Sequence, residues 1–109
     1  MDYGCGTGTA SCEFASQVKE VRGIDISSEM IRIAQQKAIT NKAENVNFEK
    51  ADIFESKFQK ESFDVILAFN MLHTVPDPQN ITQRINELLK PDGLFISVTP
   101  CLRQKMSFL

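Results

Sequence analysis

Three glycines alternate near the start of the chain, in Gly4-Cys5-Gly6-Thr7-Gly8, directly after a short segment that resembles the end of a strand. Glycine reaches positive backbone angles at little cost, and its missing side chain lets a ligand approach the backbone closely. A helix predicted over residues 9–17 brings its unpaired N–H groups to the same loop. The order strand, glycine loop, helix is typical of a ligand-binding turn, with a purely structural tight turn as the alternative.

Asp25 ends an apolar segment that predicts a second strand within residues 18–25. A carboxylate at that position can accept hydrogen bonds from both hydroxyls of a ribose, although an aspartate before a helix can also act as a cap.

The glycine spacing separates two classes of ligand. In the dinucleotide pattern G-x-G-x-x-G the third glycine would stand at Thr9, whereas this chain has Gly8, which disfavours a nicotinamide-dependent oxidoreductase without excluding it.

Strands and helices alternate along the rest of the chain. The predicted strands cover residues 1–3, 18–25, 46–50, 63–70 and 94–99, and the predicted helices cover 9–17, 28–41 and a segment that begins at Asp77-Pro78. Ser27 and Asp77 are good helix caps, and proline is accepted in a first helical turn. Five strands joined by four connections, three of them helical, predict an α/β, Rossmann-like, doubly wound parallel sheet in a three-layer sandwich.

Apolar positions indicate which faces are buried. The run Val65-Ile66-Leu67-Ala68-Phe69 predicts a strand buried on both faces, and Pro91-Asp92-Gly93 predicts a turn before the last strand. The residues expected on buried helix faces are Cys12, Phe14 and Ala15, then Met30, Ile33, Ala34 and Ala38, then Ile81, Ile85, Leu88 and Leu89.

Length and composition exclude several classes. A chain of 109 residues fits one domain, and a net charge of -2 disfavours nucleic acid as the main partner. No apolar run approaches the roughly 20 residues that span a bilayer. The first residues do not resemble a signal peptide, and three cysteines, Cys5, Cys12 and Cys101, form neither a disulfide framework nor a metal-ligand pattern. We therefore expect a cytoplasmic protein with reduced thiols and no metal site.

Segments that resemble one family occur in order along almost the whole chain. They are Asp2-Tyr3-Gly4-Cys5-Gly6-Thr7-Gly8, Gly23-Ile24-Asp25-Ile26-Ser27-Ser28-Glu29-Met30, Ala51-Asp52-Ile53, Phe63-Asp64-Val65-Ile66, Leu72-His73-Thr74-Val75-Pro76-Asp77-Pro78 and Leu88-Leu89-Lys90-Pro91-Asp92-Gly93-Leu94. Together they resemble class I methyltransferases that depend on S-adenosylmethionine (SAM), nearest to the small-molecule group with ubiquinone- and menaquinone-biosynthesis enzymes. The resemblance ends near Pro100, which suggests a SAM-binding core at residues 1–100 and a remnant at 101–109.

The resemblance implies a role for each matching residue on the ribose and methionine side of SAM. Gly4, Gly6 and Gly8 would line the methionine and ribose portions, and Asp2 would help to anchor the loop and the amino group. Asp25 would hold the ribose diol. The residues alone independently indicate only the glycine loop and Asp25.

The resemblance also implies an adenine site. Ile26 and Met30 would pack on the adenine, although both side chains also suit an ordinary core. Asp52 would accept a hydrogen bond from the adenine amino group, or else cap its own loop, and Ile53 would contribute its backbone N–H.

On the acceptor side, the resemblance implies that Phe69 and Asn70 close the pocket near the methyl donor. His73, the one histidine of the chain, follows the same strand and is a weak candidate for a catalytic base. Methyl transfer from a sulfonium is a direct displacement that needs alignment more than a base. The resemblance therefore predicts transfer to an unidentified small-molecule acceptor.

Departures from the family support an alternative, a non-catalytic fragment or pseudoenzyme that keeps the SAM-binding fold. The first strand is short, and the last two strands of the family are missing, so the predicted sheet is incomplete and truncated at both ends. An incomplete sheet leaves an exposed edge at which copies of the chain can associate. We expect residues 1–109 alone to be marginally stable and a poor enzyme.

Overall fold

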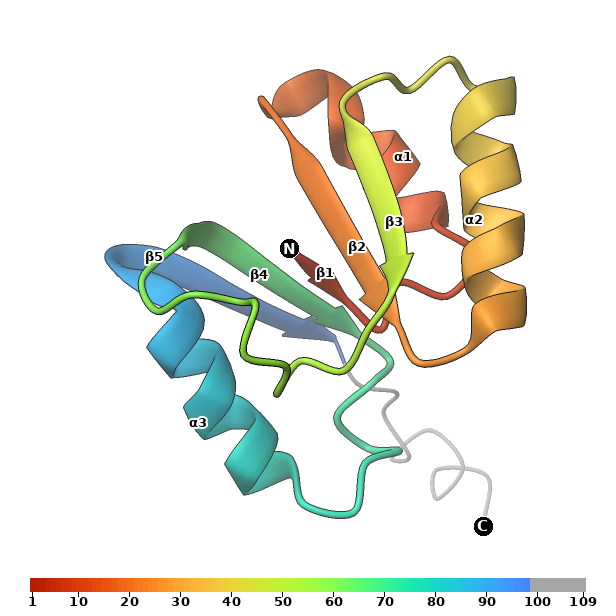
Figure 1. Cartoon of the computed structure of the whole chain (residues 1–109). Coiled ribbons are helices and arrows are strands. Elements are labelled where there is room, and N and C mark those ends of the chain that lie inside the picture. Colours follow the sequence, from red (N-terminus) through yellow and green to blue (C-terminus); the bar gives the residue numbers. More distant parts are fainter. Residues whose placement is uncertain (99–109) are drawn as a thin grey trace, which may run out of the picture.

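Five parallel strands form one sheet in the order β3-β2-β1-β4-β5 in the computed structural model (Figure 1). The strands are β1 Asp2–Tyr3, β2 Val21–Asp25, β3 Val46–Lys50, β4 Phe63–Phe69 and β5 Leu89–Val98. The structure describes residues 1–98, so the expectations for Thr99, Pro100, Cys101 and the remnant at 101–109 lie outside the described residues. The sheet order and the parallel pairing confirm the predicted Rossmann-like, doubly wound fold in a partial form.

The helices are α1 Thr9–Phe14, continued by the 3-10 turn η1 Ala15–Gln17, then α2 Ser28–Thr40 and α3 Pro78–Leu88. Both predicted caps are present: the Ser27 hydroxyl accepts a hydrogen bond from the Met30 N–H at 3.2 Å, and the Asp77 carboxylate accepts one from the Asn80 N–H at 3.2 Å. Side-chain caps satisfy N–H groups that the first helical turn leaves unpaired. No helix among residues 1–98 is long and apolar enough to cross a membrane.

The helices cover both faces of the sheet, which gives the predicted three layers. On one face, Ala15 of η1 and Ile31 and Ala34 of α2 pack against Val21 and Phe48. On the other face, α3 packs against the strands through Ile81, Ile85 and Leu88, together with Ile24, Ile53 and Ile66. Successive strand residues point to opposite faces, so β1 sends Tyr3 to the α3 face and Asp2 to the α1 face.

Some predicted buried faces are wrong. On α1 the fully buried side chain is Ser11, while Phe14 is 37% exposed and Cys12 is only partly buried. Ser11 is buried because its hydroxyl donates to the Asp2 carboxylate, a contact that hydrophobic periodicity does not reveal. On α2, Ile31 is buried although the predicted stripe did not include it.

The run in β4 is buried on one face only. Ile66 and Ala68 are fully buried against the α3 side, whereas Val65, Leu67 and Phe69 are half-buried on the α1 side. Their neighbours in β5, Leu94, Ile96 and Val98, are also exposed. The prediction of a strand buried on both faces fails because no described helix covers the α1 side of β4 and β5.

The predicted turn at Pro91-Asp92-Gly93 lies inside a strand. Strand β5 starts at Leu89, which pairs with Phe63, and the next paired residue is Leu94, which faces Val65. The extra residues between these pairs form a bulge, a local departure from regular pairing that bends a strand without ending it.

Candidate functional site

The carboxyl ends of β1, β2 and β3 bring the glycine loop, Asp25 and Asp52 to one edge of the sheet. Along the chain the sheet grows from β1 through β2 to β3 on one side, and from β4 to β5 on the other. The strand order therefore reverses between β1 and β4, immediately where the glycine loop leaves β1. Ligands of open α/β sheets bind outside the carboxyl ends of the strands at such a point.

All three loop glycines have positive φ angles, 69° at Gly4, 54° at Gly6 and 79° at Gly8. Their surroundings differ. A Cβ added at Gly4 would overlap the Met71 side chain, and one added at Gly8 would lie 2.5 Å from Cζ of Phe48, whereas one added at Gly6 would meet nothing within 4 Å. Gly6 is therefore the loop glycine whose backbone faces open space, which fits close approach of a ligand.

Asp25 is joined directly to that glycine. Its Oδ2 accepts a hydrogen bond from the Gly6 N–H at 2.9 Å, and its Oδ1 accepts one from the Ser27 N–H at 2.9 Å. An ionised carboxylate has about four acceptor positions, so each oxygen keeps capacity for one more donor. Asp25 does not cap α2, because Ser27 is the N-cap of that helix. The two hydrogen bonds that Asp25 accepts are compatible with a diol-binding role.

Asp2 lies beneath the loop and is almost completely buried. Its Oδ2 accepts a hydrogen bond from the Ser11 hydroxyl at 2.6 Å, which fixes α1 to β1. Burial raises the pKa of the Asp2 carboxyl, and the Ser11 hydrogen bond opposes part of that rise. Asp2 therefore anchors the elements on either side of the loop.

Asp52 begins the connection from β3 to β4. Its Oδ1 accepts a hydrogen bond from the Phe54 N–H at 2.9 Å, and its own N–H donates to the Glu55 carboxylate at 2.6 Å. Asp52 thus caps its loop, as the alternative from the sequence proposed, and its carboxylate is held in place. Burial raises the pKa of Tyr3, and the charges of Asp52 and then Asp25 add to the rise, so the two carboxylates act on the same end of the sheet.

The apolar residues predicted around the adenine lie in different environments. Ile26 is 69% exposed beside Asp25, so its side chain is not part of the core, and Met30 is half-buried in the first turn of α2. The Ile53 side chain is fully buried in the core on the α3 face, which leaves its backbone for any ligand contact. Phe54 is 44% exposed and follows Asp52 closely, although sequence reasoning did not single it out.

At the end of β4, Asn70 has a φ of 55° and its N–H donates to the Val98 carbonyl at 2.7 Å. The Phe69 ring lies against Phe14, with ring centroids 6.3 Å apart. His73 is exposed in the connection that leads to α3.

A groove of about 630 Å³ in the described chain does not coincide with this edge. It lies on the uncovered α1 side of β4 and β5, and Gly6, Asp25 and Asp52 do not line it. Its apolar wall is formed by Phe14, Val18, Val65, Leu67, Phe69 and Ile96. We favour the open edge as the functional site because it holds the polar groups, whereas the groove is the uncovered side of a sheet.

Other chemistry is not supported by the described residues. Among residues 1–98, no group of three His, Cys, Asp or Glu side chains is placed to hold a metal ion. Burial raises the pKa of the Cys5 thiol to about 12, and the charges of Asp2 and Asp25 add to the effect. Cys5 is therefore a protonated, packed side chain within the loop.

The sheet order, the glycine loop at its switch point and the acidic residue at the end of β2 are the features of the Rossmann-like class that binds SAM. The chain belongs to the methyltransferase domain family, which matches residues 1–107. SAM is the cofactor of this class. Membership of a methyltransferase family also argues against the nicotinamide-dependent oxidoreductase that the glycine spacing had left open.

Known proteins resemble this chain both in sequence and in structure. The ubiquinone biosynthesis O-methyltransferase of Haemophilus ducreyi is 38% identical over an alignment of 103 residues, which covers 89% of this chain and 43% of that protein. The crystal structure of the YcgJ protein of Bacillus subtilis has a TM-score of 0.85 and 31% identity, and the match covers 90% of this chain and 42% of that one. The [4+2]-cyclase SpnF matches with a TM-score of 0.80 and 27% identity, over 86% of this chain and 35% of its own. The chain thus spans less than half the length of these relatives.

Proposed function

We propose that the carboxyl edge of the sheet binds SAM and that the protein transfers its methyl group to a small-molecule acceptor. The observation that carries the proposal is the pair formed by Gly6 and Asp25. The glycine has open space beside it, and the carboxylate that holds its N–H at 2.9 Å keeps acceptor capacity for a ribose diol. The relatives that are named O-methyltransferases make an oxygen nucleophile the first acceptor to test.

The remaining site residues then take the roles that the family pattern gives them. Gly4 and Gly8 shape the loop around the methionine and ribose portions, and Asp2 anchors it from below. Asp52, already held by its own turn, accepts a hydrogen bond from the adenine amino group. The exposed Ile26 packs on the adenine face, where burial of its side chain contributes to binding.

Bound SAM supplies an activated methyl group on a sulfonium, so the protein contributes binding, orientation and exclusion of water. Phe69 and Asn70, at the end of β4, close the site on the acceptor side. His73 is exposed and is not required as a base in this scheme. A drop of about a hundredfold in turnover for His73→Ala with unchanged SAM affinity would assign it that role instead.

The same fold also supports a second candidate, a protein that binds SAM without methyl transfer. The observation that favours this second candidate is the structural match to a protein named as a [4+2]-cyclase. Incubation of the chain with methyl-labelled SAM and small hydroxylated acceptors separates the two candidates. Label in an acceptor supports methyl transfer, whereas binding of SAM with no labelled product supports the second candidate. We place the activity in the cytoplasm, as the sequence analysis predicted.

The binding step is tested by isothermal titration with S-adenosylhomocysteine. Asp25→Asn keeps one oxygen to accept from the Gly6 N–H but loses the charge, and we expect binding to weaken by about 1.5–3 kcal/mol, the range for hydrogen bonds to charged groups. The control is Asp64→Asn, which removes an exposed carboxylate paired with Lys90 at the amino end of β4. Equal affinities for the wild type and Asp25→Asn would remove Asp25 from the site.

A further inference from the structure

The connection between β3 and β4, residues 51–62, contains no helix and is held by side chains instead. It starts with two turns: the Glu55 N–H donates to the Asp52 carbonyl at 3.0 Å, and the Phe58 N–H donates to the Glu55 carbonyl at 3.2 Å. Ile53 and Phe58 fix it to the core, because both side chains are almost completely buried. This connection carries Asp52, so whatever fixes its backbone also fixes that carboxylate.

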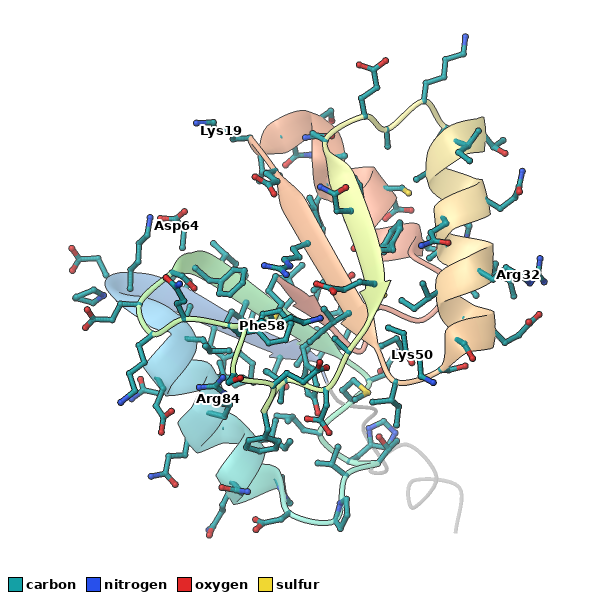
Figure 2. The ribbon with its side chains drawn as sticks, in the orientation of Figure 1. Lys19, Arg32, Lys50, Phe58, Asp64 and Arg84 are labelled. Atoms are coloured by element: carbon teal, nitrogen blue, oxygen red, sulfur yellow. The ribbon has the colours of Figure 1, made fainter. Side chains whose placement is uncertain are left out.

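Arg84 of α3 reaches into this connection (Figure 2). Its Nε donates to the Ile53 carbonyl at 3.0 Å, and one terminal nitrogen donates to the carbonyls of Glu55 at 3.1 Å and Phe58 at 3.2 Å. The other terminal nitrogen lies 3.4 Å from the Glu87 carboxylate. The Arg84 side chain is only 13% exposed, so these partners satisfy a mostly buried cation.

Among these contacts of Arg84, the hydrogen bond to the Ile53 carbonyl is the one that affects the candidate site at the carboxyl edge. Ile53 follows Asp52 directly, so its carbonyl is part of the backbone that sets where the Asp52 carboxylate points. A planar guanidinium fixes several acceptors in a defined geometry, which a flexible ammonium does not reproduce. Without Arg84 the part-buried carbonyls of Ile53 and Phe58 lose this donor, whereas the Glu55 carbonyl keeps the Phe58 N–H. Buried carbonyls without partners favour rearrangement of the loop.

We propose that Arg84 is a positioning residue for adenine recognition, acting through the Ile53 carbonyl on the Asp52 carboxylate. This inference rests on the proposed function, because it requires SAM at the carboxyl edge. Arg84 lies outside every segment that resembles the family, and its partners are backbone carbonyls 26 to 31 residues away in sequence. Its role is specific to the base: it leaves the glycine loop and Asp25 untouched.

The test compares S-adenosylhomocysteine with S-inosylhomocysteine, in which an oxygen replaces the adenine amino group. A carboxylate accepts from the amino group and repels the oxygen, so we expect the wild type to prefer the adenine compound by about tenfold, the scale of a hydrogen bond to a charged group. We expect Arg84→Met to bring the ratio of the two affinities close to one, and Arg84→Lys to give an intermediate ratio. Asp52→Asn should also lower the ratio, with no further loss in the double variant.

The ratio separates positioning from loss of fold. A variant that is partly unfolded binds both compounds less well by the same factor, which leaves their ratio unchanged. Arg32→Met is the matched control, because exposed Arg32 pairs with Glu29 on α2 and does not touch the loop; its ratio should equal that of the wild type.

Each result decides a different claim. A wild-type ratio that survives in Arg84→Met, with Asp52→Asn lowering it, overturns the inference about Arg84 and leaves the proposed function standing. A wild type that binds both compounds equally overturns the role of Asp52 and, with it, that of Arg84. A wild type that binds neither compound overturns the proposed function.

Discussion

At two of the loop glycines, Gly6 and Gly8, we expect substitution by alanine to cause two different kinds of damage. A non-glycine residue in the left-handed region costs about 1–2 kcal/mol, and this cost applies at both Gly6 and Gly8. At Gly8 the new methyl group would also lie 2.5 Å from Cζ of Phe48 and 3.0 Å from Cβ of Ala34. Overpacking of this kind costs about a further 1–3 kcal/mol.

The total for Gly8→Ala is therefore about 2–5 kcal/mol, a large part of the roughly 5–15 kcal/mol that stabilises a small domain. Gly6→Ala is expected to lose only about 1–2 kcal/mol, because its methyl group meets no neighbour. That methyl group enters the space that we assign to SAM. Gly6→Ala should therefore remain folded and bind S-adenosylhomocysteine poorly, and the larger Gly6→Val should bind it less well still.

Urea unfolding followed by circular dichroism, without ligand, measures the first effect, and calorimetric titration of the folded variants measures the second. Cys5→Ala is the matched control within the loop, because it removes a packed, protonated thiol and leaves the backbone angles unchanged. The proposed roles of Gly6 and Gly8 would be wrong if Gly6→Ala were as unstable as Gly8→Ala, or if Gly6→Ala bound S-adenosylhomocysteine with the affinity of the wild type.

Two further predictions concern stability and association. Burial raises the pKa of Asp2, so its contribution to stability is fully present below the ordinary aspartate pKa of about 4 and is lost as the pH rises through the raised value. Asp2→Asn can still accept from the Ser11 hydroxyl, so it should be more stable than the wild type above that range. Its advantage in the free energy of unfolding, measured with urea, should grow with pH. An advantage that stays constant with pH would contradict burial of the Asp2 carboxylate as the cause. The exposed apolar side chains of β5 should make copies of the chain associate through the uncovered face and sheet edge, and Ile96→Lys should lower the mass measured by analytical ultracentrifugation at high concentration. A monomeric wild type at that concentration would contradict this expectation.

Local sequence signals predicted much of the fold. The caps Ser27 and Asp77 stand where side chains satisfy the first N–H groups of a helix, and both are present in the structure. Apolar alternation in residues 46–50 located β3 with its observed limits. These features depend on neighbours within about four residues along the chain, so one sequence is enough to find them.

The structural features that the sequence did not predict depend on contacts between segments that are far apart along the chain. Ser11 is polar, and only its hydrogen bond to Asp2 explains its burial. Arg84 belongs to an ordinary helical pattern, and nothing in that pattern indicates the three carbonyls that it reaches. Phe14 was expected to be buried, but the face of β4 and β5 beside it is not covered by any described helix. In the site, the glycine spacing and Asp25 were visible in the sequence, whereas the difference between Gly6 and its neighbours required coordinates.

Nuclear magnetic resonance of the isotope-labelled chain can locate the SAM site at the level of single residues. Titration with S-adenosylhomocysteine detects weak binding and shows which backbone amides respond. We expect the largest shifts at the carboxyl edge, at Gly6, Gly8, Ile26 and Ile53. We expect little change at Val65 and Ile96, which line the apolar groove. Shifts confined to the groove, or no shifts at saturating ligand, would show that SAM does not bind at the carboxyl edge.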